Sequence, residues 1–129
     1  MKYVCIGYYA EENWNSMSEV EQEAFIEKAT EFDNFLKENG HFIRGEALQE
    51  AHSARTLRFR GGKVIVTDGP YAETKEQIGG LLLLEAESLD QAVELMSRHP
   101  GVRMGPFEIR PTAEECNVMS TEKPTANSQ

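Results

Sequence analysis

Two short segments that can start helices limit what this 129-residue chain can fold into. Ser18 is followed three residues later by Glu21, and residues 88–91 repeat this capping-box form, which closes the first turn of a helix. Apolar residues recur at helical spacing behind each box, and Gly40 ends the longer run. The chain is therefore expected to contain two amphipathic helices, each with one buried stripe.

Strand-like segments surround these two helices. Apolar runs or polar–apolar alternation occupy residues 3–9, 42–48, 55–60, 63–67, 79–86 and 106–110. Gly61–Gly62 is expected to be a two-residue hairpin turn, because both of its residues need positive φ. Residues 10–15 are expected to form a loop. This order predicts an α+β fold, the ferredoxin-like split βαβ arrangement with an inserted β-hairpin.

Two helices can cover only one face of such a sheet. The other face would be left bare, and a bare apolar face needs a partner. Because two sheets of this kind can pack face to face, the sequence predicts a symmetric homodimer.

Length and composition indicate one domain over residues 1–111, followed by a flexible polar tail over residues 112–129. No apolar run approaches the ~20 residues that span a bilayer, and the N-terminus lacks a signal-peptide pattern. Cys5 and Cys116 are far apart in the sequence, which does not favour a disulfide framework. We therefore expect a cytoplasmic protein with reduced thiols and no membrane segment.

The net charge of −9 is unevenly distributed. Residues 11–38 carry nine acidic residues and two lysines, whereas residues 51–75 carry five basic residues and two acidic ones. The overall negative charge argues against direct binding of nucleic acid. The local positive charge suits a small anionic ligand, although solvated strand edges are the favoured explanation for Arg58, Arg60 and Lys63.

The segment over residues 66–77 lies between two apolar runs, where small folds often keep their functional groups. Asp68 is a candidate general base, or it accepts backbone N–H bonds and fixes the turn at Gly69–Pro70. The turn role is favoured, because the tripeptide Asp-Gly-Pro is more typical of a turn than of a catalytic site. Tyr71 either donates its phenol to a ligand or plugs the core, and the plug is favoured.

Five charged residues are candidates for binding a substrate. Glu73, Lys75 and Glu76 either bind a small polar or anionic molecule or form an exposed ion-pair set. Arg44 and Glu46, which flank Gly45, either line the same cleft or lie on a sheet edge.

His99 follows the second helix, either as a C-terminal residue favoured by the helix dipole or as a proton carrier facing the loop. The three histidines share no metal-ligand spacing, and no glycine-rich phosphate loop is present. The sequence therefore predicts no metal and no cofactor.

Residues 68–80, Asp-Gly-Pro-Tyr-Ala-Glu-Thr-Lys-Glu-Gln-Ile-Gly-Gly, closely resemble the signature of the YCII-related family, in the branch named for a DGPF motif. Tyr71 stands where that motif has Phe. Residues 1–3, 45–48 and 108–111 also look like that branch, so the resemblance covers residues 1–111. It implies a dimeric α+β barrel of ferredoxin-like protomers.

The resemblance also bears on activity. A His and an Asp have been suggested as a catalytic pair in the wider family, and some related proteins act on muconate-type ring-cleavage products. The family His position falls at Ala29 and the family Asp position at His99, so neither residue is present as such. Association of DGPF-type domains with alternative sigma factors implies a regulatory partner.

These observations lead to two hypotheses. The first is a homodimer with a small-molecule cleft beside the Asp68–Lys75 loop, acting as an acid–base isomerase or lyase on a small polar or anionic substrate. Asp68 would be the base or orienting group, His99 the proton carrier and Lys75 the anion contact, which requires the three to meet in one pocket. The alternative is a non-catalytic binding or regulatory module with a protein partner, linked to sigma-factor-dependent transcription.

Overall fold

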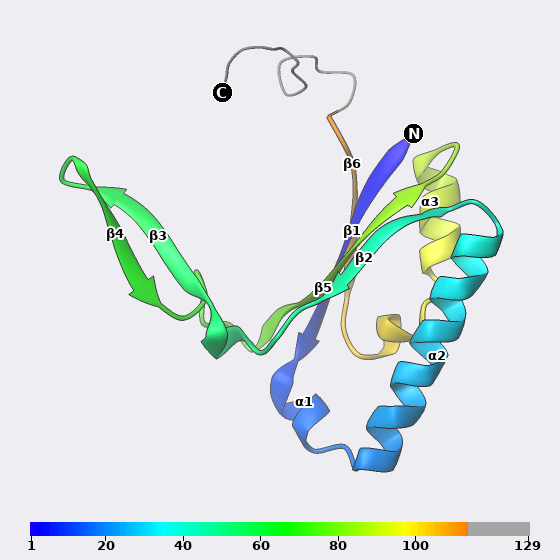
Figure 1. The fold of residues 1–129 in the computed structure, drawn as a ribbon, viewed down its shortest axis with the longest axis horizontal. Helices are drawn as coiled ribbons and strands as arrows, with labels where there is room; N and C mark the ends of the chain where they lie inside the picture. Colours follow the sequence, from blue (N-terminus) through cyan, green and yellow to red (C-terminus); the bar gives the residue numbers. More distant parts are fainter. Residues whose placement is uncertain (114–129) are drawn as a thin grey trace.

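The computed structural model describes residues 1–113 of the chain (Figure 1). In chain order the elements are β1 (Lys2–Ala10), α1 (Glu11–Asn15), α2 (Glu19–Glu38), β2 (Phe42–Ala47), the 3-10 turn η1 (Ala51–Ser53), β3 (Arg55–Arg60), β4 (Lys63–Asp68), β5 (Glu76–Glu85), α3 (Leu89–Met96), the 3-10 turn η2 (Pro100–Arg103) and β6 (Phe107–Pro111). Most of the expected tail lies outside the described residues, but Thr112 donates its N–H to the Lys2 carbonyl at 3.0 Å. No described helix is long and apolar enough to cross a membrane.

Four strands form the main sheet in the order β2-β5-β1-β6, with all neighbours antiparallel. Helices α2 and α3 cover one face of this sheet, and the opposite face carries no helix (Figure 1). The predicted α+β class is confirmed, and the strand order is compatible with a ferredoxin-like fold. The inner face of the sheet, toward the helices, holds the core.

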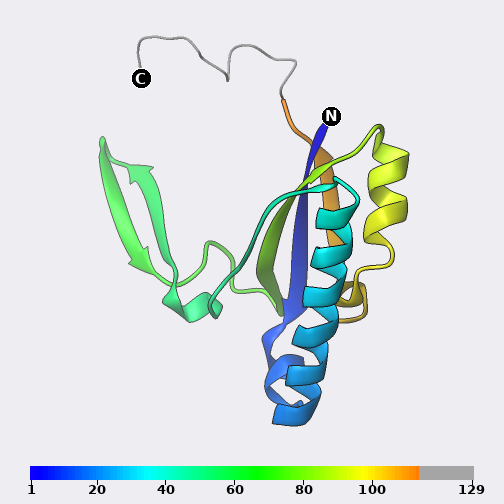
Figure 2. The ribbon, with the colours of Figure 1, turned by 45° about the vertical axis from the view of Figure 1, so that its right-hand side comes forward.

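Strands β3 and β4 form a separate two-stranded sheet, here called the arm (residues 55–68). The predicted turn at Gly61–Gly62 is confirmed, with φ values of 59° and 77°. The arm stands on the side of the main sheet away from the helices in both ribbon views (Figures 1 and 2). The inserted hairpin is therefore present, but it adds no strand to the main sheet.

The first predicted capping box is confirmed. Glu21 donates its N–H to the Ser18 hydroxyl at 3.1 Å, and the Glu21 carboxylate accepts the Ser18 N–H at 2.9 Å. The second box forms only in part. Gln91 donates its N–H to the Ser88 hydroxyl at 3.1 Å, but the Gln91 side chain accepts from Glu87 instead of closing on Ser88.

The prediction of a loop over residues 10–15 is wrong, because Glu11–Asn15 form helix α1. Two acidic residues in its first turn suit the positive end of the helix dipole. The Trp14 ring meets the Phe25 ring of α2 edge-on, with centroids 5.7 Å apart. This tertiary contact holds a helix that is too short to form by itself.

Removal of the Ser18 cap is expected to destabilise the fold. Ser18→Ala should lower the free energy of unfolding by about 1 kcal/mol, because it leaves the Glu21 N–H without its acceptor. Urea denaturation measures this loss. Ser97→Ala is the matched control, because that hydroxyl only donates to the Glu94 carbonyl at the exposed end of α3. Equal losses in the two variants would show that the box does not anchor α2.

Candidate functional site

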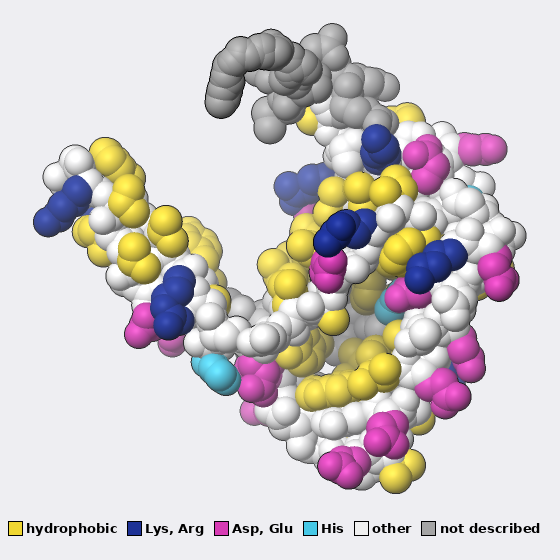
Figure 3. All heavy atoms as spheres, in the orientation of Figure 1, with side chains coloured by type: hydrophobic (Ala, Val, Ile, Leu, Met, Phe, Trp, Pro, Cys, Tyr) yellow, Lys and Arg dark blue, Asp and Glu magenta, His cyan; other side chains and the backbone are white. Residues whose placement is uncertain are grey.

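A cavity of about 720 Å³ lies between α2 and the inner face of the sheet. Figure 3 shows the molecule hollowed in this region, with hydrophobic side chains around the opening. The apolar part of its wall includes Trp14, Phe25, Ile26 and Phe107. Helix α2 also contributes Asp33, and the segment after α3 contributes His99. An apolar cavity with a few polar groups is the usual form of a small-molecule site.

The strand register explains why the cavity exists. Tyr3 pairs with Leu84 and Cys5 with Leu82, and these large inner-face residues fill the core at one end of the sheet. Two residues further along β1 and β5, Gly7 pairs with Gly80, and Gly80 in turn pairs with Ala47 of β2. This row, Gly7–Gly80–Ala47, has almost no side-chain volume of its own, and on its β6 side the Phe107 ring covers Gly7. Space therefore remains beside that ring, between the sheet and α2.

Asp33 is a half-buried carboxyl group that α2 contributes to the cavity. Among residues 1–113, no hydrogen-bond donor reaches its Oδ1 atom, which is inaccessible to solvent. Burial raises the pKa of Asp33 above its ordinary value, and the nearby Lys37 ammonium only partly opposes this effect. A carboxyl group whose pKa moves toward neutrality can exchange a proton with a ligand.

His99 lines the same cavity and is held in one orientation. Its Nδ1 atom accepts the Gly101 N–H at 2.8 Å. The imidazole ring lies against Phe32 and Phe107, with ring centroids 5.4 and 5.0 Å away. Burial lowers the pKa of His99, so the neutral ring is favoured. Its predicted place at the end of a helix dipole is not what holds it, because it caps the 3-10 turn η2 instead.

Cys5 and Tyr9 also line the cavity, and the pKa of each is shifted. Burial raises the pKa of the Cys5 thiol to about 11, so this group stays protonated and is a poor nucleophile. The pKa of Tyr9 is raised by burial and by the carboxylates of Glu11 and Glu50. Within residues 1–113, no three His, Cys, Asp or Glu side chains are placed to hold a metal ion.

The favoured structural roles of Asp68 and Tyr71 are both wrong. Asp68 ends strand β4 with its side chain 89% exposed, and it pairs with Arg55 at 3.1 Å instead of accepting backbone N–H bonds. Tyr71 is 79% exposed, so it does not plug the core, and the Arg58 guanidinium lies over its ring at 5.4 Å. Both side chains are held by the basic strand β3.

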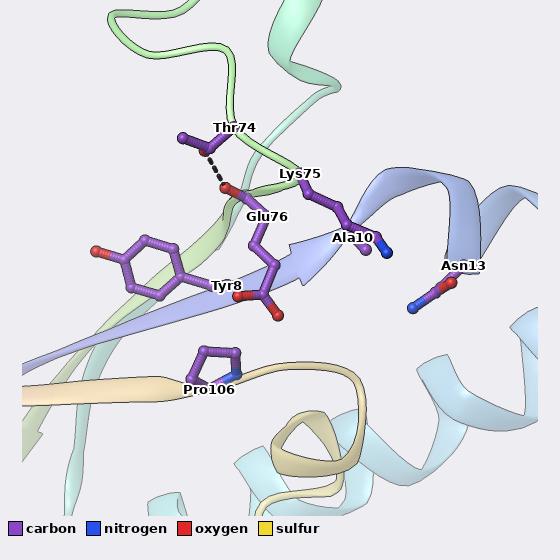
Figure 4. A pocket seen from close by; sticks show the side chains of 7 residues that line it. All are labelled: Tyr8, Ala10, Asn13, Thr74, Lys75, Glu76 and Pro106. Atoms are coloured by element: carbon purple, nitrogen blue, oxygen red, sulfur yellow. Dashed lines mark hydrogen bonds between the residues drawn. The ribbon is translucent and has the colours of Figure 1, made fainter.

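A second, wide-open pocket of about 620 Å³ lies at the end of the loop. Figure 4 shows Glu76 reaching between Tyr8 and Pro106, while Lys75 runs toward Asn13. The Lys75 ammonium is 3.9 Å from the Glu12 carboxylate, and both side chains are largely exposed. The loop therefore borders a shallow depression rather than an enclosed cleft.

The predicted site residues are divided among different places. Lys75 and Glu76 border the shallow pocket, whereas His99 and Glu46 line the cavity under α2. Four others line neither of these two pockets: Arg44, Asp68, Tyr71 and Glu73. Arg44 pairs with Glu46 at 2.7 Å on the sheet edge, as one alternative expected. Asp68, His99 and Lys75 thus share neither pocket, and their joint catalytic role stays a prediction.

Sequence reasoning missed Asp33. The signal was an acidic residue within the apolar stripe of α2, three residues before the fully buried Leu36 and one helical turn after Ala29. A charged residue at such a position is unusual, because burying its charge is costly.

Comparison with known proteins places the chain in a family. Residues 1–115 match the family model of the YCII-related domain. The chain belongs to the YCII-related family. It is 33% identical to an uncharacterised protein of Rhizobium meliloti over 117 residues, which make up 88% of this chain and 93% of that protein.

The positions of Asp33 and His99 can be compared with the pattern that the family resemblance implies. That pattern would place a His at the position of Ala29 and an Asp at the position of His99. In this chain the acid comes from α2, one turn beyond Ala29, and the imidazole comes from position 99. An acid and an imidazole therefore line one cavity, but the acid does not stand at the position of Ala29.

The buried imidazole is expected to make the fold acid-sensitive. The folded-state pKa of His99 lies below the ordinary value of 6.5, so the unfolded chain binds a proton first as the pH falls. This part of the stability is complete above pH 6.5 and is lost as the pH falls toward the folded-state pKa. His99→Gln should flatten the dependence of the unfolding free energy on pH in that window, measured by urea denaturation. His52→Gln, at an exposed position, is the control and should keep the wild-type slope.

Proposed function

We propose that this protein catalyses proton transfer beside the carbonyl group of a small molecule bound in the cavity between α2 and the sheet. One observation carries the proposal. A half-buried carboxyl group, whose Oδ1 atom has no donor among the described residues, and an imidazole with one nitrogen already engaged line the same cavity. Burial raises the pKa of Asp33 and lowers that of His99, and titratable groups perturbed in this way inside a cavity are typical of functional sites.

The hydrogen bond from Gly101 supports a defined role for His99. Because Nδ1 accepts this N–H, the proton of the neutral ring resides on Nε2. Among the described residues, no acceptor is bonded to Nε2. Neutral His99 can therefore donate Nε2–H to a carbonyl oxygen, as neutral imidazoles do in some isomerases.

The proposed step moves one proton and one electron pair. The ionised Asp33 carboxylate takes a proton from the carbon next to the carbonyl, and the C–H electrons become the enolate. His99 Nε2–H stabilises the negative charge on the enolate oxygen. Asp33 then returns the proton to the γ-carbon of a β,γ-unsaturated substrate, which yields the conjugated isomer without any oxidant or reductant.

The cavity wall favours a neutral substrate. No lysine or arginine lines the cavity among the described residues, whereas Asp33, Glu46 and Glu50 do. An anion would enter an apolar space without a counter-charge, which costs free energy. The substrate class we propose is thus a neutral ketone or lactone, which differs from the anionic ligand expected for the loop.

Removal of the carboxylate is expected to abolish this reaction. The probes are neutral β,γ-unsaturated cyclic ketones and lactones, followed by the ultraviolet absorbance of the conjugated product. Asp33→Asn and His99→Phe should each lower kcat by about 10²-fold or more, because each removes one partner of the proton transfer. Asp68→Asn should keep the wild-type rate. Loss of activity in Asp68→Asn, with normal rates in the other two, would place the chemistry at the loop instead.

Filling the cavity is expected to block binding. Ala47 belongs to the small-residue row, so Ala47→Leu should raise the Kd of a neutral probe ketone by about tenfold or more without loss of fold. Ligand-observed NMR measures the Kd. Ala72→Leu, in the exposed loop outside the cavity, is the size-matched control. Unchanged binding in Ala47→Leu would exclude this cavity as the ligand site.

A second candidate function is binding without catalysis in the same cavity. It is favoured by the few polar groups among the mainly apolar wall residues. Probe binding that Ala47→Leu abolishes, with no isomerisation of any probe, would support this candidate over the enzyme.

We also propose a homodimer formed through the bare face of the sheet. The register places Leu83 and Val4 between Arg44 and Arg110, and it places Leu81 and Ile6 between Glu46 and Glu108. Within one copy Arg44 pairs with Glu46 and Arg110 with Glu108. A two-fold axis that runs parallel to these rows, in the plane between two such faces, would exchange the rows and also bring each arginine to a glutamate of the second copy. An apolar centre with a self-complementary charged rim supports pairing with a second copy.

A further inference from the structure

One face of the arm is apolar beyond the Arg55–Asp68 ion pair at its base, and nothing in the described part of the chain covers it. Cross-strand partners share a face, so Leu57–Val66 and Phe59–Val64 lie together. The side chains of this face are 57–73% exposed: Leu57, Phe59, Val64 and Val66. The other face carries Arg58, Arg60 and Lys63. A two-stranded hairpin is at best marginally stable by itself, so its apolar face marks a contact surface.

The root of the arm is closed by hydrogen bonds. Gly69 donates its N–H to the Ala54 carbonyl at 2.8 Å. The Thr56 hydroxyl donates to the Gly69 carbonyl, also at 2.8 Å. These bonds join the two ends of the hairpin, so its two strands leave the domain together.

The direction of the arm identifies what can reach its apolar face. The arm stands off from the bare side of the main sheet (Figures 1 and 2), and hydrophobic side chains lie on both sides of the open space between them (Figure 3). The charged rows of the bare face are self-complementary for a second copy. A copy seated on that face would occupy the space in front of the arm.

We propose that the β3–β4 arm is a dimer clasp, which packs its apolar face on a second copy of the chain seated against the bare sheet. The proposal rests on the face-to-face dimer put forward above and goes beyond it. It assigns the arm, and with it the Asp68 end of the family motif, to contacts between the two copies. In this dimer each copy would hold the other at two places, the sheet and the arm.

Three variants test the clasp, with mass measured by sedimentation equilibrium. Phe59→Asp changes the apolar face, Arg60→Ser changes the opposite face, and the third variant replaces residues 55–68 by Asn-Gly between the bonded ends Ala54 and Gly69. The wild type is expected to be dimeric at micromolar concentration. Phe59→Asp and the arm-deleted chain should raise the dimer Kd by about tenfold or more, while Arg60→Ser changes it less.

A fourth variant separates the clasp from the sheet interface. Leu83→Asp puts a charge on the bare face and should also weaken the dimer. If Leu83→Asp weakens the dimer but neither arm variant does, the sheet interface stands and the clasp is wrong. A wild type that is monomeric overturns both. Because the arm lies outside the main sheet, the arm variants are expected to keep the circular dichroism spectrum of a folded domain.

Intermolecular contacts give a second measurement that does not depend on mass. Isotope-filtered NMR on a mixture of labelled and unlabelled chains should detect contacts from the methyl groups of Leu57, Val64 and Val66 to the other copy. A dimer in which these methyl groups show no intermolecular contact would overturn the clasp.

Discussion

The row Gly7–Gly80–Ala47 is the constraint on which the rest of this structure depends. One end of the inner sheet face carries large side chains that pack against the helices, and the other end carries almost none. A close-packed interior tolerates few voids, so a cavity of this size is a feature of the sequence rather than loose packing. It leaves room for a ligand under α2 while the core at the other end of the sheet holds the domain together.

Each face of the main sheet has a different function in our proposals: the inner face binds the ligand and the outer face contacts a second copy. The inner face, through this cavity, brings Asp33 and His99 together with apolar walls. The outer face carries apolar rows with charged ends, and the arm extends from the same side (Figure 1). Because side chains alternate along a strand, β1 and β5 contribute alternate residues to the site and to the opposite surface.

Much of the fold could be predicted from local patterns. The capping box at Ser18 and the Gly61–Gly62 turn each depend on a few neighbouring residues, and the structure has both. The helical stripe behind the box is present only in part, because Leu36 is buried whereas Val20 is exposed. The predictions failed where distant contacts decide. Helix α1 forms because Trp14 meets Phe25, and Tyr71 is exposed because its loop follows an arm that leaves the core.

The sequence by itself determined the α+β class, the order of the strands along the chain and the family. Periodicity and motifs depend on residues that lie close together in the sequence, so they can be recognised without the tertiary structure. The sequence also supplied His99 as a candidate. Only the tertiary structure decided which side chains share a site. Asp33 and His99 are far apart along the chain, and they line one cavity because α2 and the segment after α3 pack on the same sheet face. Asp68, in the most distinctive motif, lies outside that cavity because the arm carries it away from the core.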